Sequence, residues 1–237
     1  MPNNNIKAVL LIEELGISFN HPLIREALTH PSLKQSATDA SYERLEFLGD
    51  AVLGLVIAEY LFKRYPYFDS GRLSRAKSHF VSEESLAQVA RELQLGSLIL
   101  MGKGEEKGGG REKPSVLSDA FEAVVGAIYL IGGLGKARKF IMKAFKPLLK
   151  SMTGIFLKDY KSLLQEYVQS QNKPLPQYVL VKANGLPHDR VFTVQVKIEG
   201  EVYGEGMGKT KKEAGMIAAK KALEKLGILN DTNENYE

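Results

Sequence analysis

The feature that most constrains the fold is a change in hydrophobic periodicity shortly after residue 152. Before this point, apolar residues recur three and four positions apart, as Leu117, Phe121 and Val124 do, which is the spacing of one helical face. After it, one helical stretch is followed by three runs in which apolar and polar residues alternate, as in half-buried strands. Because the two patterns occupy separate blocks, the sequence predicts two domains.

The second block predicts a small α+β domain. Its stretches follow one another in the order α-β-β-β-α, which packs as an antiparallel sheet with two helices on one face. The stretches expected to form these elements are residues 158–169, 178–183, 191–198, 201–207 and 211–226. The predicted segments of the whole chain are an all-α domain at 1–152, a linker at 153–157, the α+β domain at 158–228 and a frayed tail at 229–237.

The composition excludes several kinds of site. The 237 residues include no cysteine, which excludes a disulfide scaffold, a thiolate zinc site and a cysteine nucleophile. With only four histidines in the chain, any metal ion is expected to have oxygen ligands. The apolar runs are shorter than the roughly 20 residues of a membrane span, and the first residues lack the basic region of a secretory signal. We therefore expect a soluble cytoplasmic protein with no membrane partner.

Three carboxylates lie close together on one predicted helix of the first domain. Glu43, Glu46 and Asp50 fall within about 60° of one another on a helix of 3.6 residues per turn. This arrangement fits either a solvent-facing acidic edge of an amphipathic helix or an acidic site. On the opposite face lie the apolar residues expected in the core, which are Leu45, Leu48, Val52 and Leu55.

A second pair of carboxylates favours a site. Asp119 and Glu122 stand one turn apart on a later predicted helix, whose same side continues with the small residues Ala123 and Gly126. Small residues let another helix approach closely, whereas a surface edge does not require them. If the two helices face each other, up to five carboxylates converge, and only bound cations or retained protons make such a cluster stable. Because oxygen ligands suit Mg²⁺ or Mn²⁺, the spacing predicts a divalent-metal site.

Three blocks of the first domain resemble the ribonuclease III family. ERLEFLGDA at 43–51 matches the nine-residue signature of that family at every position, and ALTHPS at 27–32 and LSDAFEA at 117–123 resemble two further blocks in the expected order. The resemblance implies an all-α endonuclease domain that forms a homodimer. The chain departs from the family at Ser70, where many members have a glutamate, and Asp69 precedes it. An auxiliary acidic role at this position stays open.

The resemblance also implies roles for particular residues. Phe47 lies beside the acidic face and away from the apolar stripe, and the resemblance implies that it contacts the second subunit. The alternative is that Phe47 covers the core of its own domain. The implied ligands of Mg²⁺, for which Mn²⁺ can substitute, are Glu46, Asp50, Asp119 and Glu122. The implied catalytic residues are Asp50, Glu122 and Glu43, of which Glu43 is the least suited to direct ligation.

The second domain resembles a double-stranded RNA-binding domain. It is basic, with 12 Lys and Arg against 8 Asp and Glu in residues 158–228, which favours a polyanionic partner. Lysines at the start of its last helix oppose the helix dipole, so binding to phosphate explains them better than the alternative of a solubilising face. The residues implied to contact RNA are Ser162, Gln165, Glu166 and Gln169 on the first helix, Pro187 and His188 in the first hairpin loop, and Lys209, Lys211 and Lys212.

Taken together, the resemblances imply an endoribonuclease that hydrolyses double-stranded RNA with a metal-activated water. The expected products have 5′-phosphate and 3′-hydroxyl ends with short 3′ overhangs, and the expected substrates are structured precursors such as rRNA and some mRNAs. We expect no small-molecule cofactor. The alternative from another class is a non-catalytic RNA-binding dimer of the same fold, which is expected to have lost one or more of the five acids that this chain retains.

Overall fold

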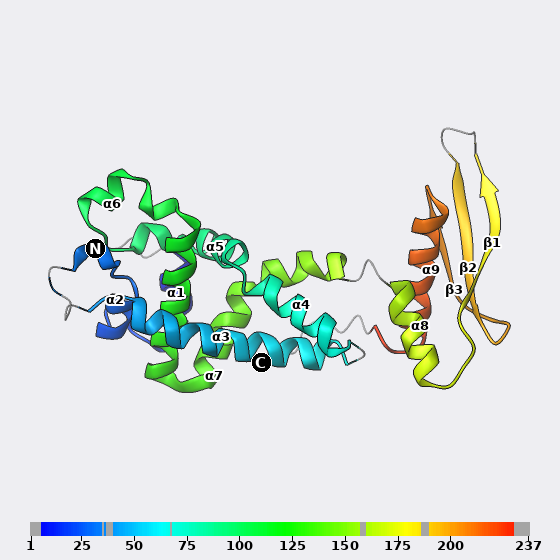
Figure 1. Cartoon of the computed structure of the whole chain (residues 1–237), viewed down its shortest axis with the longest axis horizontal. Helices are drawn as coiled ribbons and strands as arrows, with labels where there is room; N and C mark the ends of the chain where they lie inside the picture. Colours follow the sequence, from blue (N-terminus) through cyan, green and yellow to red (C-terminus); the bar gives the residue numbers. More distant parts are fainter. Residues whose placement is uncertain are drawn as a thin grey trace. The chain divides into compact units, whose positions relative to one another are not determined.

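The computed structural model describes residues 6–34, 36, 40–66, 68–156, 160–185 and 190–229. The chain divides into two compact units, Met1–Met152 and Thr153–Glu237. Figure 1 shows that helices form the first unit, whereas the second combines helices with a sheet. Each unit is described by itself below.

The described part of the first unit is built from helices, which confirms the all-α prediction. Besides the helices it contains one isolated parallel bridge, between Thr29 and Leu100. The helices in chain order are α1 (Lys7–Glu14), α2 (Pro22–Ala27), η1 (Pro31–Leu33), α3 (Glu43–Arg64), α4 (Ser70–Phe80), α5 (Glu83–Glu92), η2 (Leu95–Leu98), α6 (Lys103–Lys107), η3 (Gly110–Glu112) and α7 (Pro114–Phe156).

The two longest helices, α3 and α7, supply much of the core. Glutamates in the first turn of α3 and Lys63 and Arg64 in its last turn complement the helix dipole. Phe121, Phe140 and Phe145 of α7 are fully buried, and the rings of Phe121 and Phe140 stack with their centroids 5.9 Å apart. α7 is interrupted at Gly133, whose φ of 74° lies in the left-handed region that glycine tolerates, so it consists of two successive helices.

By length and composition alone, α7 could cross a membrane. Residues 114–149 contain an 18-residue window with a mean hydropathy of 1.5, but 61% of that window is buried inside the unit. This burial is typical of the central helix of a protein core. Towards its end, α7 extends through Phe156 and therefore into residues 153–157, the segment predicted to be a linker.

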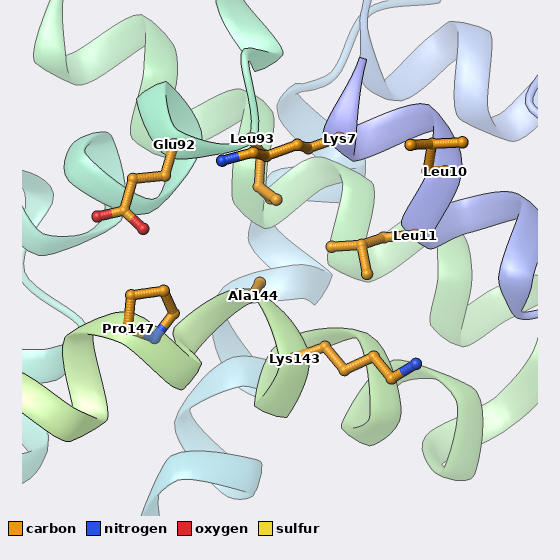
Figure 2. A pocket seen from close by; sticks show the side chains of 8 residues that line it. All are labelled: Lys7, Leu10, Leu11, Glu92, Leu93, Lys143, Ala144 and Pro147. Carbon is orange, nitrogen blue, oxygen red and sulfur yellow. The ribbon is translucent and has the colours of Figure 1, made fainter. Parts of the chain in front are cut away.

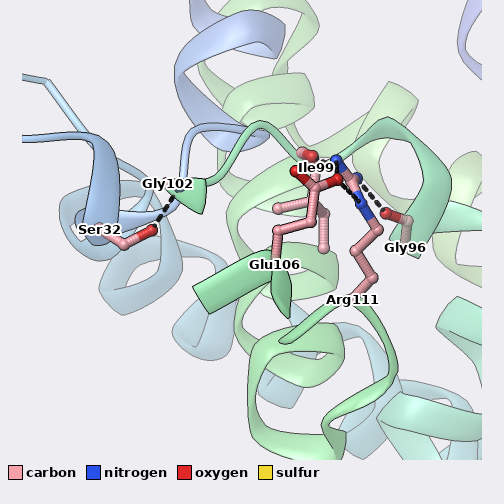
Figure 3. Close-up of polar contacts among 6 residues, drawn as sticks. All are labelled: Ser32, Gly96, Ile99, Gly102, Glu106 and Arg111. Carbon is pink, nitrogen blue, oxygen red and sulfur yellow. Dashed lines mark hydrogen bonds and ion pairs between the residues drawn. The ribbon is translucent and has the colours of Figure 1, made fainter. Parts of the chain in front are cut away.

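The segment from Gly102 to Pro114 is rich in glycine and charged residues, a composition typical of a loop, yet it contains the helices α6 and η3. Figure 3 shows how Arg111 ties this segment to the preceding one. The Arg111 guanidinium donates to the carbonyl oxygens of Gly96 and Ile99 at 2.9 and 2.6 Å and to the Glu106 carboxylate at 2.8 Å. One guanidinium group thus joins two backbone carbonyls of the η2 segment to a carboxylate of α6.

The second unit has the predicted α-β-β-β-α order. Its antiparallel sheet has the strand order β1-β2-β3, α9 packs on β2 and β3, and α8 packs on α9 (Figure 1). A Cβ added at Gly206 would overlap the α9 backbone, so the helix lies directly on the strand there. The elements are α8 (Tyr160–Ser170), β1 (Gln177–Asn184), β2 (Val191–Ile198), β3 (Glu201–Gly208) and α9 (Lys211–Lys225).

Candidate metal centre and RNA-binding surface

The predicted approach of the two acidic helices is present in the structure. α3 and α7 cross in backbone contact at Gly49 and Gly126. A Cβ added at Gly49 would overlap the carbonyl oxygen of Glu122, and one added at Gly126 would overlap the carbonyl oxygen of Leu45. No side chain separates the helices at this point, so the carboxylates that flank it on both helices are brought together.

Three of the predicted metal ligands converge at this crossing. Each of Glu46, Asp119 and Glu122 offers one carboxylate oxygen, and these oxygens all lie within 4.8 Å of one another. All three side chains are partly buried. Glu46 comes from α3 and the other two from α7, so the cluster depends on the packing of the helices and not on either helix alone.

Burial and mutual repulsion raise the pKa of these carboxyl groups. Burial, followed by the charges of Asp50, Glu46 and Asp119, raises the pKa of Glu122 to about 8. Burial and the neighbouring carboxylates raise the pKa of Glu46 as well. Burial also raises the pKa of Asp119, although the nearby hydroxyl groups of Ser118 and Tyr42 oppose this effect. Without a cation, the cluster therefore retains a proton near neutral pH, as the sequence argument requires.

The other two predicted acids occupy different surroundings. Asp50 is exposed one turn after Glu46 and lies outside the group of three, but its charge is the largest charge effect on the pKa of Glu122. Glu43 is exposed, forms an ion pair with Lys34 and accepts a hydrogen bond from the Ser41 hydroxyl at 2.9 Å. Both contacts lower the pKa of Glu43, which is thus neutralised by protein groups.

At Ser70, where a glutamate was expected from the resemblance, the preceding residue Asp69 has a structural role. Asp69 is the N-cap of α4, and its carboxylate accepts a hydrogen bond from the backbone N–H of Arg72 at 2.7 Å. Ser70 is the first residue of that helix.

The donor set of the cluster fits a hard divalent cation. Carboxylate oxygens from two helices converge, and burial together with their mutual repulsion raises the pKa of Glu46 and Glu122. Oxygen-only sites of this kind suit Mg²⁺ or Mn²⁺. Sequence reasoning missed one further residue near the cluster, the buried Tyr42, whose pKa is raised by burial and by the charge of Asp119. Its only sequence signal is that Tyr42 directly precedes the signature block.

A shallow groove of about 270 Å³ lies elsewhere in the first unit, between α1, α5 and α7 (Figure 2). Its floor is apolar, and Lys143 at its rim pairs with Glu14. None of its lining residues belongs to the carboxylate cluster. The lining residues are Lys7, Leu10, Leu11, Glu92, Leu93, Lys143, Ala144 and Pro147.

The face of α3 beside the acids is apolar and exposed. Phe47 is 81% exposed, so the alternative that it covers its own core is wrong for this unit taken alone. Leu55, predicted to be in the core, is 53% exposed, and Phe62 further along the same face is 70% exposed. The three side chains lie within about 80° of one another on the helix and form an apolar stripe, here called the α3 stripe.

In the second unit, the predicted RNA-contacting residues of α8 lie opposite its buried face. Leu163, Leu164 and Val168 are buried, and among the polar residues Gln165 and Gln169 are exposed while Ser162 and Glu166 are partly exposed. Two further predicted residues, Pro187 and His188, lie outside the described residues.

The predicted lysines surround the start of α9. Lys209, Lys211 and Lys212 are all exposed. Thr210 caps the helix by accepting from the backbone N–H of Glu213 at 3.1 Å, and the Glu213 carboxylate accepts from the backbone N–H of Lys209 at 2.8 Å. The helix start is thus fixed by these two residues, and the lysine side chains are not needed to cap it.

Comparison with known proteins identifies both units. Residues 20–149 match the family model described as Ribonuclease-III-like, and residues 160–226 match the double-stranded RNA binding motif. The chain belongs to the ribonuclease III family. It is 47% identical over 224 residues to the Ribonuclease 3 of Borreliella burgdorferi, covering 92% of this chain and 91% of that protein. It is 46% identical over 230 residues to the Ribonuclease 3 of Pelotomaculum thermopropionicum, covering 95% of each.

A solved structure agrees with this family assignment. The nuclease domain of ribonuclease III from Campylobacter jejuni is 44% identical, has a TM-score of 0.54, and covers 60% of this chain and 97% of that structure. The chain is therefore a ribonuclease III-type endoribonuclease with a double-stranded RNA-binding domain. Within the ribonuclease III family fold, the carboxylate cluster belongs to the nuclease unit and the basic helix start belongs to the RNA-binding unit.

Proposed function

We propose that this chain cleaves double-stranded RNA as a Mg²⁺-dependent homodimer and leaves 5′-phosphate and 3′-hydroxyl ends with short 3′ overhangs. The observation that supports this most directly is the convergence of Glu46, Asp119 and Glu122 within 4.8 Å at the crossing of α3 and α7. We further propose that it acts in the cytoplasm on structured precursors such as rRNA and some mRNAs.

In this proposal the carboxylates of Glu46, Asp50, Asp119 and Glu122 hold the metal. When bound, divalent ions at such a cluster supply an activated water and stabilise the leaving 3′-oxygen. Because its pKa is raised, Glu122 keeps a proton near neutral pH when no metal is bound, and it must lose this proton to act as a ligand. Metal binding and deprotonation of Glu122 therefore occur together. Glu43 is proposed to act beside the metal ligands and not as a direct ligand, because its carboxylate is held by Lys34 and Ser41. Mn²⁺, which has the same preference for oxygen, can substitute.

The α3 stripe supports the homodimer. Phe47, Leu55 and Phe62 expose large apolar side chains along one side of a helix, and a second copy of the same stripe is a self-complementary partner for it. In the Campylobacter jejuni ribonuclease III, a region of the nuclease domain is involved in dimer formation. A dimer would place two carboxylate clusters in one particle, as is needed to cut both strands of a duplex.

In this proposal the second unit binds the RNA duplex. The polar face of α8 suits the 2′-hydroxyls and base edges of a shallow minor groove, and the α9 lysines suit phosphates. Pro187 and His188 are proposed to contact a second minor groove. Recognition of this kind follows the shape of the duplex and implies little sequence preference.

The test is cleavage of an end-labelled RNA duplex longer than about 20 base pairs by the full-length protein. We expect discrete shortened duplexes with Mg²⁺ and intact RNA with EDTA. Glu122→Ala is expected to abolish cleavage and leave RNA affinity nearly unchanged, whereas Glu13→Ala, at an exposed position of α1, is expected to cleave normally. Intact RNA with Mg²⁺, together with a gel shift, would instead support an RNA-binding protein without nuclease activity.

A further inference from the structure

Lys161 contacts two other elements of the second unit. It lies in the first turn of α8 and is only partly exposed, and its ammonium nitrogen is 4.4 Å from the centroid of the Tyr178 ring on β1. Tyr178 pairs with the fully buried Val196 of β2, so it belongs to the face of the sheet that the helices cover. The charged end of Lys161 is therefore directed towards the packed layer between helices and sheet.

Gly215 of α9 leaves the space for this ammonium group. It is buried in the interior of α9, where glycine is less favourable than alanine. A Cβ added at Gly215 would stand 2.6 Å from Nζ of Lys161 and 2.7 Å from its Cε, which is too close for either atom to stay in place. The Tyr178 ring, 3.7 Å from the same added Cβ, is at ordinary contact distance. Even the smallest side chain at Gly215 would thus displace the ammonium group and leave the ring where it is.

α8 is fixed in the unit by side chains, whereas α9 is fixed by its backbone. A Cβ added at Gly204 or Gly206 of β3 would overlap backbone atoms of α9, so this helix lies directly on the strand. α8 packs on α9, and its orientation depends on which of its side chains are buried there. The attraction between Lys161 and Tyr178 adds a directional contact, because a cation–π interaction requires the ammonium group within about 6 Å of the ring centroid.

The Lys161 contact lies between the two groups of predicted RNA-contacting residues. Gln165 follows Lys161 by one turn of α8, and Lys211 precedes Gly215 by one turn of α9. The contact of Lys161 at Gly215 therefore sets the distance between the polar face of α8 and the lysines at the start of α9. An RNA duplex presents its minor groove and its phosphates at a fixed spacing, so recognition of its shape depends on this distance.

We propose that Lys161 is a positioning residue for RNA binding. Its ammonium group does not contact phosphate. It holds α8 against Tyr178 and Gly215, so that the polar face of α8 and the lysines of α9 fit one duplex together. The inference rests on the proposed function, because it requires that these two surfaces contact the RNA.

The test is binding of a fluorescently labelled RNA duplex of about 20 base pairs to the full-length protein, measured by fluorescence anisotropy over a range of salt concentrations in EDTA. Lys161→Met removes the charge and keeps a long side chain, whereas Gly215→Ala keeps the lysine and displaces it from the ring. Each substitution is expected to weaken binding by about 3- to 30-fold, the range of a cation–π contact at a partly buried site. The slope of log affinity against log salt should stay unchanged, because no phosphate contact is lost.

Gly215→Ala separates positioning from stability. Alanine favours a helix more than glycine does, so the thermal midpoint of this variant by circular dichroism should equal or exceed that of the unmodified protein while its RNA affinity falls. The double variant should bind no more weakly than the weaker single variant, because both substitutions remove the same contact. The matched control is Lys220→Met, which removes an exposed lysine of α9 that pairs with Glu224 at 3.5 Å and is expected to bind RNA as the unmodified protein does.

The outcomes separate this inference from the proposed function. RNA binding by the unmodified protein and equal binding by Lys161→Met and Gly215→Ala would overturn the positioning role. A salt slope lowered by about 1 for Lys161→Met would overturn it as well, because Lys161 would then contact phosphate itself. Equal weakening by Lys220→Met would assign the effect to net charge. Absence of duplex binding by the unmodified protein would overturn the proposed function and this inference together. If Lys161→Met does not fold, Gly215→Ala alone decides.

Discussion

Replacing Glu122 by glutamine removes a negative charge from the carboxylate cluster and preserves the shape of the side chain. The pKa of Glu122 rises from an ordinary 4.5 to about 8 in the folded protein because of burial and the charges of Asp50, Glu46 and Asp119. The folded state therefore binds this proton more tightly than the unfolded state does. Binding of this proton stabilises the folded state against the unfolded state. This stabilisation is fully present below pH 4.5 and is lost as the pH rises through about 8, so that the ionised carboxylate destabilises the fold at high pH.

The size of the effect follows from this pKa difference. One pKa unit corresponds to about 1.4 kcal/mol, so folding at pH 7 costs up to about 3 kcal/mol relative to a carboxyl group with no shift. Because Glu122 is only partly buried, solvent screening reduces this to about 1–2 kcal/mol. Glutamine is neutral at every pH and does not incur this cost. In EDTA we expect Glu122→Gln to be more stable than the unmodified protein by about 1–2 kcal/mol at pH 7 and by a few tenths of a kcal/mol near pH 4.5.

The assay is urea unfolding followed by far-ultraviolet circular dichroism, at equal protein concentrations in EDTA at both pH values. Excess Mg²⁺ should reverse the order of stability. A ligand at 100 times its dissociation constant stabilises the folded state by about 2.7 kcal/mol, and this gain is expected for the unmodified protein and not for Glu122→Gln.

Glu43→Gln is the matched control, because it makes the same change of charge on α3. The ion pair with Lys34 lowers the pKa of Glu43, so this substitution removes a favourable contact and should not stabilise the protein. Equal stabilisation by both substitutions would mean that net charge, and not local repulsion, causes the effect. A gain for Glu122→Gln that is the same at pH 7 and pH 4.5 would refute the protonation argument.

Three further predictions concern the helix crossing, the dimer and the RNA-binding surface. Gly49→Ala should destabilise the protein by about 2–3 kcal/mol in urea unfolding, because the added methyl group overlaps the α7 backbone, whereas Gly135→Ala, with open space around the added Cβ, should not destabilise it. Phe47→Asp should leave the subunit folded and raise the dissociation constant of the dimer roughly 1000-fold in analytical sedimentation, because two buried copies of this aromatic side chain contribute about 4 kcal/mol to the dimer. An unchanged dimer would exclude the α3 stripe as the interface. The double variant Lys211→Gln and Lys212→Gln should lower the slope of log affinity against log salt by about 2 in RNA-binding titrations, and an unchanged slope would mean that these lysines do not contact phosphate.

Features determined by local pattern could be predicted from the sequence. β2 spans the predicted residues 191–198, and the alternation that predicts it is set by which side chains face α9. The approach of the acidic helices was predictable because Gly126 and Ala123 continue the side of α7 that bears Glu122, and small residues on one side of a helix are a local signal of a close neighbour. The convergence of three carboxylates followed from that approach.

Features that depend on distant partners could not be predicted. The segment 102–114 has the composition of a loop, and it is ordered by Arg111, whose acceptors Gly96 and Ile99 lie 15 and 12 residues away in sequence. The exposure of Leu55 was missed because periodicity identifies an apolar face without telling whether it is covered by the same chain. The proximity of Tyr42, which precedes α3, to Asp119 on α7 depends on how the two helices pack, and no spacing rule within one helix reveals it.

The glycine contact between α3 and α7 also bears on how this protein can change its sequence. At Gly49 and Gly126 the separation of the two helices is set by backbone atoms alone, with no side chain whose size could vary. Substitutions among the apolar residues elsewhere in the core can then alter stability without altering the spacing of the carboxylates. The spacing of the metal-binding carboxylates therefore does not depend on which apolar residues fill the rest of the core. A protein built in this way can accept many substitutions in its core and keep the separation of its acids.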